Sequence, residues 1–407
     1  MKRRLLPILM TLVLVCALPI WAAFVTSGDV TDPLVSTAEA SEPLKLEEVS
    51  TADDLRAKIT NGKSVKLMAD ISITSTLEIA KSLTLDLNGH VLKMTGSGSV
   101  LKVSDRATLT ITDSRPQNPH TGSYGRLPAG GVITGGKADK GGGILLAGGC
   151  TLKLTGGCIT DCHATDTGGG GVVLNGDTAI LYMSGTARIE NCTAGETWGA
   201  NAIFNSGTMY ADGGTVDGTV NNQGTIKHSN GVTAVTVFKK AVYNQQAGTI
   251  EAGRYNETVE NRGTITGGIF YGGVTNDGGK INDGAYETVT FNSDGGTPVE
   301  EAKVLRGQKV AKPTDDPTKS GYTFTGWEDA NGAGAYDFNT PVIAPLTLTA
   351  KWEKNPSSGG YYYYPTPDTK ADDVKGSPKT ADPGVALYAA LSLLSLTGLT
   401  CTGRKKF

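Results

Sequence analysis

The feature that most constrains the fold of this chain is an internal repeat marked by glycine. Segments that begin at Gly130, Gly156, Gly185 and Gly213 align with one another, with spacings of 26, 29 and 28 residues. A repeat of this length usually holds one supersecondary unit, which buries its apolar face only by stacking on its neighbours. The repeat therefore predicts a solenoid.

The repeating units become shorter after residue 206. Glycine followed by Thr or Lys and an apolar residue recurs at Gly207, Gly224, Gly248, Gly263 and Gly279. Short runs of β-branched residues in period two lie between these markers, whereas helical periodicity is absent. The chain has 55 Gly among 407 residues, which is about twice the usual share of roughly 7% and suits many tight turns. We therefore predict an all-β fold, with a right-handed parallel β-helix over residues 41–285.

Two sets of side chains are expected to follow the coils. Asn residues precede four of the markers by two to four positions, where they could form a ladder or hold turns: Asn205, Asn222, Asn244 and Asn261. Isoleucines are expected to point inward on successive coils: Ile159, Ile189, Ile226, Ile250 and Ile265.

Four cysteines lie in the predicted coils, at Cys150, Cys158, Cys162 and Cys192. Cys162 and Cys192 occupy equivalent positions one coil apart, where adjacent strands are about 4.8 Å from each other. That distance permits a disulfide and also suits a stack of buried thiols. A zinc site formed by Cys158, Cys162, His163 and Cys192 is a third alternative, although this spacing fits no common structural zinc pattern.

The start of the solenoid shows a helix signal. The segment Thr51–Ile59 opens with Thr and two acidic residues, as expected of a short helix that caps the first coil. Strands are predicted at 65–67, 71–73, 83–87 and 108–111. The stretches Leu85–His90 and Thr110–Ser114 resemble the opening coils of pectate-lyase-like bacterial surface proteins, and this resemblance implies the fold more than an activity.

A separate domain is predicted at residues 286–354, where aromatic residues return. Its segments Val289–Gly296, Gly321–Trp327 and Leu346–Trp352 closely resemble the Listeria-Bacteroides repeat of internalin-like proteins. The resemblance implies a small β-grasp-like module that acts as a spacer or interaction unit. Because so short a unit has little interior, Trp327 and Trp352 are expected to anchor its core.

Both ends of the chain carry targeting signals. Residues 1–40 are predicted to be a signal peptide and leader, since Lys2–Arg4 precede an apolar run, with cleavage sites possible near Trp21–Ala23 or Ala38–Ala40. Near the other end, the apolar segment Val385–Gly403 would span about 28 Å as a helix, enough to cross a bilayer. The basic residues that follow it place the body of the protein outside the cell.

A short motif precedes this second apolar segment, formed by Ser377, Pro378, Lys379, Thr380 and Ala381. The order of motif, apolar helix and basic tail over residues 377–407 resembles the sorting signal of Gram-positive surface proteins. The resemblance implies that a sortase cuts after Thr380 and joins it to peptidoglycan. Ser377 and Ala381 stand where Leu and Gly are usual, which leaves the sortase class open.

Residues 355–376 are predicted to form a low-complexity linker across the wall, and the four consecutive tyrosines in it have no assigned role.

Catalysis is the second function to consider, because polysaccharide lyases and glycoside hydrolases also use this fold. Such enzymes need clustered carboxylates, with or without a neighbouring cation. The carboxylates on neighbouring coils, close to Arg188, are Asp161, Asp166, Asp177, Glu190 and Glu196. Carboxylates of solvated turns are the alternative interpretation.

The charge of the chain argues against a nucleic-acid partner, since 37 Lys and Arg face 40 Asp and Glu, for a net charge of -3. We expect no cofactor, metal or catalysis.

The combined signals predict an extracellular, wall-anchored protein of a Gram-positive bacterium. It would be an adhesin-like or structural protein that binds a glycan or protein of the host or the wall. Its other partners would be sortase, peptidoglycan and, before sorting, the membrane. A surface lyase or hydrolase is the alternative.

The sorting motif gives a direct prediction. Replacing Thr380 with Ala removes the residue that a sortase would join to the wall, so the variant should stay in the membrane fraction. Muramidase digestion of cells, followed by immunoblotting, checks this, with Thr369→Ala in the linker as the control. Equal release of the Thr380→Ala variant and the original would contradict the sortase prediction.

Overall fold

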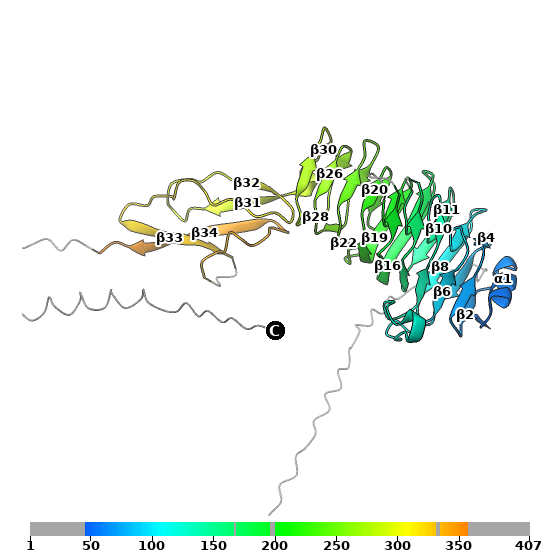
Figure 1. Ribbon diagram of the computed structural model, residues 1–407. Helices are drawn as coiled ribbons and strands as arrows, with labels where there is room; N and C mark the ends of the chain where they lie inside the picture. Colours follow the sequence, from blue (N-terminus) through cyan, green and yellow to red (C-terminus); the bar gives the residue numbers. More distant parts are fainter. Residues whose placement is uncertain (1–44, 167, 196–199, 331–333, 357–407) are drawn as a thin grey trace, which may run out of the picture. The chain divides into compact units, whose positions relative to one another are not determined.

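The computed structural model describes residues 45–356, except 167, 196–199 and 331–333. Strands stack in parallel through a long series of coils, and a smaller β domain follows them (Figure 1). The predicted all-β fold class, a parallel β-helix followed by a small β domain, is confirmed. The predicted signal peptide, the tyrosine run and the C-terminal apolar segment lie outside the described residues. Within the described part, none of the helices is long and apolar enough to span a bilayer.

Three sheets form the walls of the solenoid. The largest contains β1 (Glu47–Val49), β2 (Val65–Leu67), β3 (Ile71–Ile73), β5 (Leu83–Asp86), β6 (Val91–Met94), β8 (Thr108–Thr112), β9 (Val132–Thr134), β12 (Thr151–Leu154), β13 (Cys158–Thr160), β16 (Ile180–Glu190), β19 (Thr208–Asp217), β21 (Thr225–Lys227), β22 (Val237–Phe238), β24 (Thr249–Ile250), β25 (Arg254–Tyr255), β27 (Thr264–Ile265), β28 (Ile269–Phe270) and β30 (Lys280–Ile281). The second contains β4 (Leu77–Ile79), β7 (Leu101–Val103), β11 (Ile144–Ala147), β15 (Val172–Asn175), β18 (Ile203–Asn205), β20 (Val220–Asn222), β23 (Val242–Asn244), β26 (Val259–Asn261) and β29 (Val274–Asn276). The third contains β10 (Lys137–Ala138), β14 (His163–Ala164) and β17 (Thr193–Ala194).

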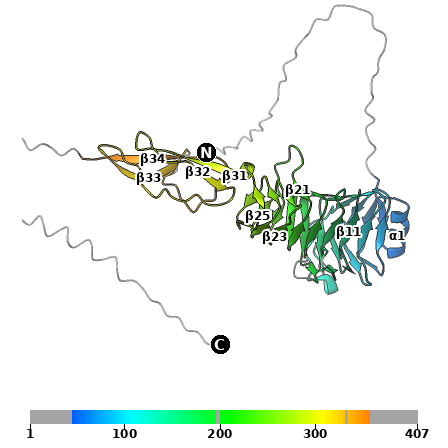
Figure 2. The ribbon, with the colours of Figure 1, turned by 90° about the horizontal axis from the view of Figure 1, so that it is seen from above.

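The helix α1 (Ala52–Thr60) lies at the first end of the coil stack, as Figures 1 and 2 both show. Thr51 caps it, because its Oγ1 accepts a hydrogen bond from the Asp54 backbone N–H at 3.3 Å. Leu55 and Ile59 are buried on the face that packs against the first strands. The predicted capping helix is therefore confirmed.

Alternation along each strand sends every second side chain into the interior, where equivalent residues stack coil upon coil. One inward row runs through Leu109, Leu152, Leu181, Met209, Ile226, Ile250 and Ile265. A second row runs through Ile133, Ile159, Ile189, Val216, Phe238, Tyr255 and Phe270. All of these side chains are buried. The prediction that the five isoleucines point inward is confirmed. They belong to two rows, because the largest sheet supplies two strand segments to a coil.

Asparagines form a continuous ladder at one edge of the second sheet. Each Nδ2 donates to the Oδ1 of the asparagine on the next coil, with distances of 2.7, 2.8, 2.7 and 2.7 Å along Asn205, Asn222, Asn244, Asn261 and Asn276. The first four are at most 1% exposed. The predicted ladder is confirmed, and the structure adds Asn276 at its exposed end.

The four cysteines in the coils are free and buried. Cys162 donates its thiol to the Thr160 carbonyl at 3.4 Å, and Cys192 donates to the Glu190 carbonyl at 3.4 Å. A hydrogen bond with Cys192, followed by burial, raises the pKa of Cys162. Of the three alternatives, the structure contains the stack of thiols.

The small domain contains four strands, β31 (Tyr286–Asn292), β32 (Ala302–Leu305), β33 (Tyr322–Asp329) and β34 (Leu346–Lys354). The strand β31 pairs with β32 in antiparallel and with β34 in parallel fashion. Two 3-10 helices complete the described elements, η1 (Gly122–Tyr124) and η2 (Asp283–Ala285).

The predicted aromatic anchors of the small domain differ in burial. Trp327 is 1% exposed and packs edge-on against Phe291, with ring centroids 5.1 Å apart, which confirms its role in the core. Trp352 is only partly buried, and its Nε1 donates to the Ser293 carbonyl at 3.0 Å. Trp352 therefore lies at the margin of this core, where its indole N–H finds a partner.

The ladder predicts a position-dependent loss of stability. Replacing Asn244 with Ala leaves the buried Oδ1 of Asn261 without its ladder donor, while the Nδ2 of Asn222 keeps only the Gly224 and Thr249 carbonyls. The free energy of unfolding should fall by about 1–3 kcal/mol. Asn276 is exposed, so Asn276→Ala should cost less than about 1 kcal/mol. Chemical denaturation of both variants checks this, and equal losses would contradict a ladder that depends on burial.

Candidate binding site

A long loop over residues 113–131 leaves the coil between β8 and β9 and folds over the outer face of the solenoid. Its Tyr124 and Leu127 pack against Val91, Val132 and Cys158. These three residues are neighbours in one outward row, because Val91 pairs with Val132 and Val132 with Cys158. The loop is therefore anchored on the solenoid by an apolar cluster of its own.

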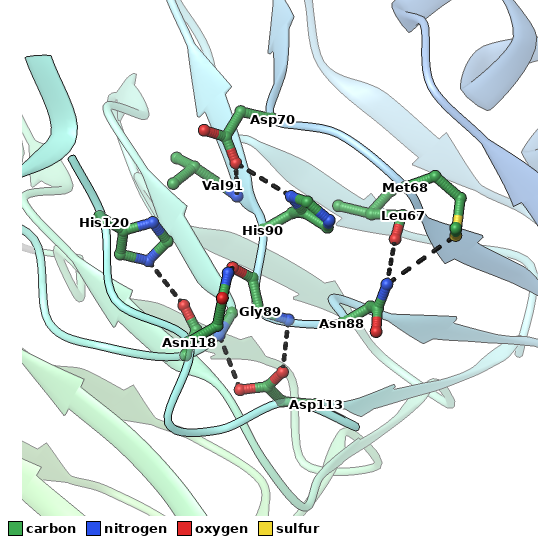
Figure 3. A network of polar contacts seen from close by, with 12 residues as sticks. Leu67, Met68, Asp70, Asn88, Gly89, His90, Val91, Asp113, Asn118 and His120 are labelled. Atoms are coloured by element: carbon green, nitrogen blue, oxygen red, sulfur yellow. Dashed lines mark hydrogen bonds and ion pairs between the residues drawn. The ribbon is translucent and has the colours of Figure 1, made fainter. Parts of the chain in front are cut away.

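Polar contacts fix the base of this loop (Figure 3). Asp113 accepts a hydrogen bond from the Gly89 backbone N–H at 2.7 Å through one oxygen, and from the Gly131 N–H at 2.6 Å through the other. Asn118 donates from Nδ2 to the Gly89 carbonyl at 2.8 Å. A Cβ on Gly131 would lie 2.2 Å from the Leu87 Cβ, so only glycine permits this approach. Asp113 therefore holds the loop in place, and backbone N–H groups occupy both of its oxygens.

Two histidines belong to the same network, as Figure 3 shows. His90 Nδ1 lies 3.3 Å from the Asp70 carboxylate, which also accepts the Val91 N–H at 2.9 Å. His120 Nε2 lies 2.7 Å from the Gly130 carbonyl. His120 therefore helps to position the loop, whereas His90 contacts the turn that carries Asp70.

A pocket with a volume of about 280 Å³ opens at the edge of this loop. Its lining comes from the loop and from the turns before β13 and within β16: Asp113, Pro116, Gln117, Ala129, Gly157, Thr186 and Arg188. Arg188 pairs with Cys158, so it is the next member of the outward row, one coil beyond the part that the loop covers.

Arg188 is the cation of this pocket. One of its Nη atoms donates to the Ala129 carbonyl at 2.9 Å, which turns the guanidinium toward the loop. Among the described residues, no carboxylate lies within 4.0 Å of it. Since a guanidinium carries five N–H donors, Arg188 keeps donors for a ligand.

The pocket can therefore hold a small anionic or polyhydroxylated group. An arginine fork matches a carboxylate or sulfate, while Thr186 and Gln117 offer a hydroxyl and an amide. The volume lies just below the range of about 300–1,000 Å³ that is typical of small-molecule pockets. One sugar unit with an acidic substituent is a ligand of suitable size and chemistry.

The structure spreads the predicted carboxylates over different turns. Asp161 occupies a left-handed turn with φ of 52°, as does Asn191 one coil later with φ of 53°. Asp177 is exposed in the turn between β15 and β16, and Asp166 is exposed near the pocket of Lys137–Lys140. Only Glu190, two residues after Arg188 on β16, shares a strand with it. Glu196 lies outside the described residues.

Arg188 and Glu190 lie on the strand next to Cys158, whose thiol is protonated and therefore unreactive. Burial, followed by the charge of Glu190, raises the pKa of the Cys158 thiol, while Arg188 acts in the opposite direction.

His163 follows Cys162 in the chain, and its Nδ1 lies 2.8 Å from the Thr193 hydroxyl. In the described part of the chain, no cluster of three or more His, Cys, Asp or Glu could hold a metal ion.

Sequence reasoning identified Arg188 but missed the loop residues and Thr186. The signal that could have found them is the distance between β8 and β9, since residues 113–131 form a much longer connection than the turns of the regular coils. A long connection in a repeat protein often carries a binding function. The sorting residues Ser377, Pro378, Lys379, Thr380 and Ala381 lie outside the described residues, so their role stays a prediction.

Comparisons with known proteins identify the small domain. Residues 288–351 match the family model of the Listeria-Bacteroides repeat domain. A "Putative Gly-rich membrane protein" of Evansella cellulosilytica is 40% identical over 70 residues, which are 17% of this chain and 8% of the relative. A "Putative membrane protein" of the same organism is 39% identical over 70 residues, or 17% of this chain and 10% of the relative. No solved structure matches the chain.

The packing of the loop 113–131 over Cys158 gives a prediction about the access of reagents to this thiol. The native protein should react very slowly with a thiol reagent at pH 8, because burial keeps the Cys158 thiol protonated. Replacing Leu127 with Ala should loosen the loop and increase labelling of Cys158 alone. Mass spectrometry of the labelled peptides checks this, with Ser123→Ala on the exposed part of the loop as the control. Labelling of Cys158 that Leu127→Ala leaves unchanged would contradict the packing of this loop.

Proposed function

We propose that this chain is a surface protein that binds an acidic glycan through its solenoid without cutting it. The observation that carries the proposal is Arg188, a guanidinium in a small polar pocket with no carboxylate within ion-pair distance among the described residues. Such a group gains most from a ligand that brings its own negative charge. The protein then acts as an adhesin-like anchor for a glycan of the host or of the bacterial wall.

A location in the cell envelope is part of this proposal. The Listeria-Bacteroides repeat and the relatives named as membrane proteins are consistent with a surface protein. The two terminal signals support export and covalent attachment to peptidoglycan by a sortase that recognises residues 377–381. In this arrangement the small domain and the linker separate the solenoid from the wall.

The chemistry of the pocket supports binding over catalysis. A glycoside hydrolase needs two carboxyl groups across the scissile bond, and a lyase needs a base beside a neutralised uronate. Asp113 is the carboxylate that lines the pocket, and backbone N–H groups already occupy both of its oxygens. Deprotonating a substrate would require Asp113 to give up the contacts that hold the loop.

The pocket predicts a specific loss of binding. The purified protein should bind oligogalacturonates more tightly than neutral maltooligosaccharides. Arg188→Ala should lower the affinity for the acidic ligand by about tenfold or more, as expected for loss of a charge-assisted contact. Arg188→Lys should restore only part of the affinity, because Lys keeps the charge but lacks the fork. Isothermal titration calorimetry measures these constants.

The matched control is Arg126→Ala, which removes an exposed arginine of the same loop outside the pocket. Assays for reducing ends and for ultraviolet-absorbing unsaturated products should show no cleavage. An unchanged dissociation constant for Arg188→Ala would contradict the pocket, and cleavage products would favour the enzyme.

A further inference from the structure

A row of long side chains crosses four consecutive coils on the outer surface of the largest sheet. Lys153 on β12 pairs with Tyr182 on β16, Tyr182 with Tyr210 on β19, and Tyr210 with Lys227 on β21. The two tyrosines are partly exposed, and the residues on either side of them along their strands point into the core. We call these four residues the Lys–Tyr row.

The rings of Tyr182 and Tyr210 in this row stack face to face. Their centroids are 4.3 Å apart with an angle of 6° between the planes. Lys153 Nζ lies 5.9 Å from the Tyr182 centroid and Lys227 Nζ lies 5.1 Å from the Tyr210 centroid, so an ammonium covers each outer ring face. Because the faces are occupied, the row cannot stack a sugar ring on them.

The row offers hydrogen-bond donors and positive charge. Burial, followed by the neighbouring Tyr210, raises the pKa of Tyr182, so its hydroxyl stays protonated at neutral pH. Neither lysine has a carboxylate within 4.0 Å in the part of the chain that the structure describes. Four side chains that carry donors therefore follow one another along the solenoid axis, on strands about 4.8 Å apart.

A column of threonines runs beside this row, two residues earlier on each strand. It follows the paired positions from β8 to β27, with Ile180 as the single interruption. Its members are Thr108, Thr151, Thr208, Thr225, Thr249 and Thr264, and all six are partly exposed. The column adds hydroxyl groups, which both donate and accept, at the same spacing as the row.

We infer that this face binds an anionic polysaccharide that lies along the solenoid axis. The two ammonium groups pair with carboxylate or sulfate groups of the polymer, and the phenol and threonine hydroxyls pair with its sugar hydroxyls. Polyphosphate would satisfy the lysines but has no hydroxyl groups for the threonine column. On the next coil, the position equivalent to Lys227 is the acidic Glu251, where the row ends. The surface that contacts the anionic polymer therefore spans four coils.

This surface goes beyond the pocket at Arg188, and the two can be tested separately. In the Arg188→Ala background, where the pocket no longer contributes, Lys153→Glu combined with Lys227→Glu should weaken binding of dextran sulfate and polygalacturonate by about tenfold or more. Added salt should weaken binding to the original protein. Tyr182→Phe combined with Tyr210→Phe keeps the stacked rings and should weaken binding severalfold through the lost hydroxyls. Biolayer interferometry with the purified full chain measures these constants.

The control for charge is Lys81→Glu combined with Lys137→Glu, two exposed lysines away from the face. This control and Arg188→Ala should both retain binding of the long polymer, and circular dichroism should show the same fold for every variant. Binding to neither polysaccharide would overturn the inference, as would polymer binding by the Arg188→Ala protein that the added Lys153→Glu and Lys227→Glu changes leave unaltered. Binding to inorganic polyphosphate alone would overturn the assignment to a glycan.

Discussion

The parallel pairing of each coil with the next is the constraint on which the other features of this protein depend. Backbone hydrogen bonds hold neighbouring strands at one spacing, and they place equivalent side chains directly above one another. A short strand of three residues has little stability alone, so the coils gain stability mainly from the shared interior. The asparagine ladder adds a second restraint, since the hydrogen bonds between its buried amides form only when the coils stay in register. A shift by one residue would break the ladder and turn the inward rows to solvent.

The same register creates both candidate surfaces. On one outward row the first residues are apolar and lie beneath the loop 113–131, whereas the next residue is Arg188, which reaches the edge of that loop. On another outward row, two tyrosines and two lysines fall on consecutive coils and form a line of donors. The solenoid thus converts a repeat in sequence into a linear array in space, which suits a polymeric partner better than a compact one.

Much of the architecture follows from the sequence because it depends on local periodicity. The glycine markers located the coils, and the asparagines before them formed the ladder that their position predicted. Ile189 and Ile226 point inward as predicted, but their separation into two rows could not be predicted. Both the first and the last part of β16 belong to the same sheet, and a repeat alignment does not show which part a residue occupies. The pocket could not be predicted, since Gln117 and Arg188 meet only when the long loop folds back over the coils.

The central claim is that the solenoid holds an intact acidic glycan at positions set by the coil register. A crystal structure of the protein soaked with an oligogalacturonate tests it most directly. The account predicts density for an uncleaved oligosaccharide with a carboxylate against the Arg188 guanidinium, while the contacts of Asp113 with Gly89 and Gly131 remain unchanged. A cleaved product in the density, or a ligand that occupies neither the Arg188 pocket nor the Lys–Tyr row, would contradict it.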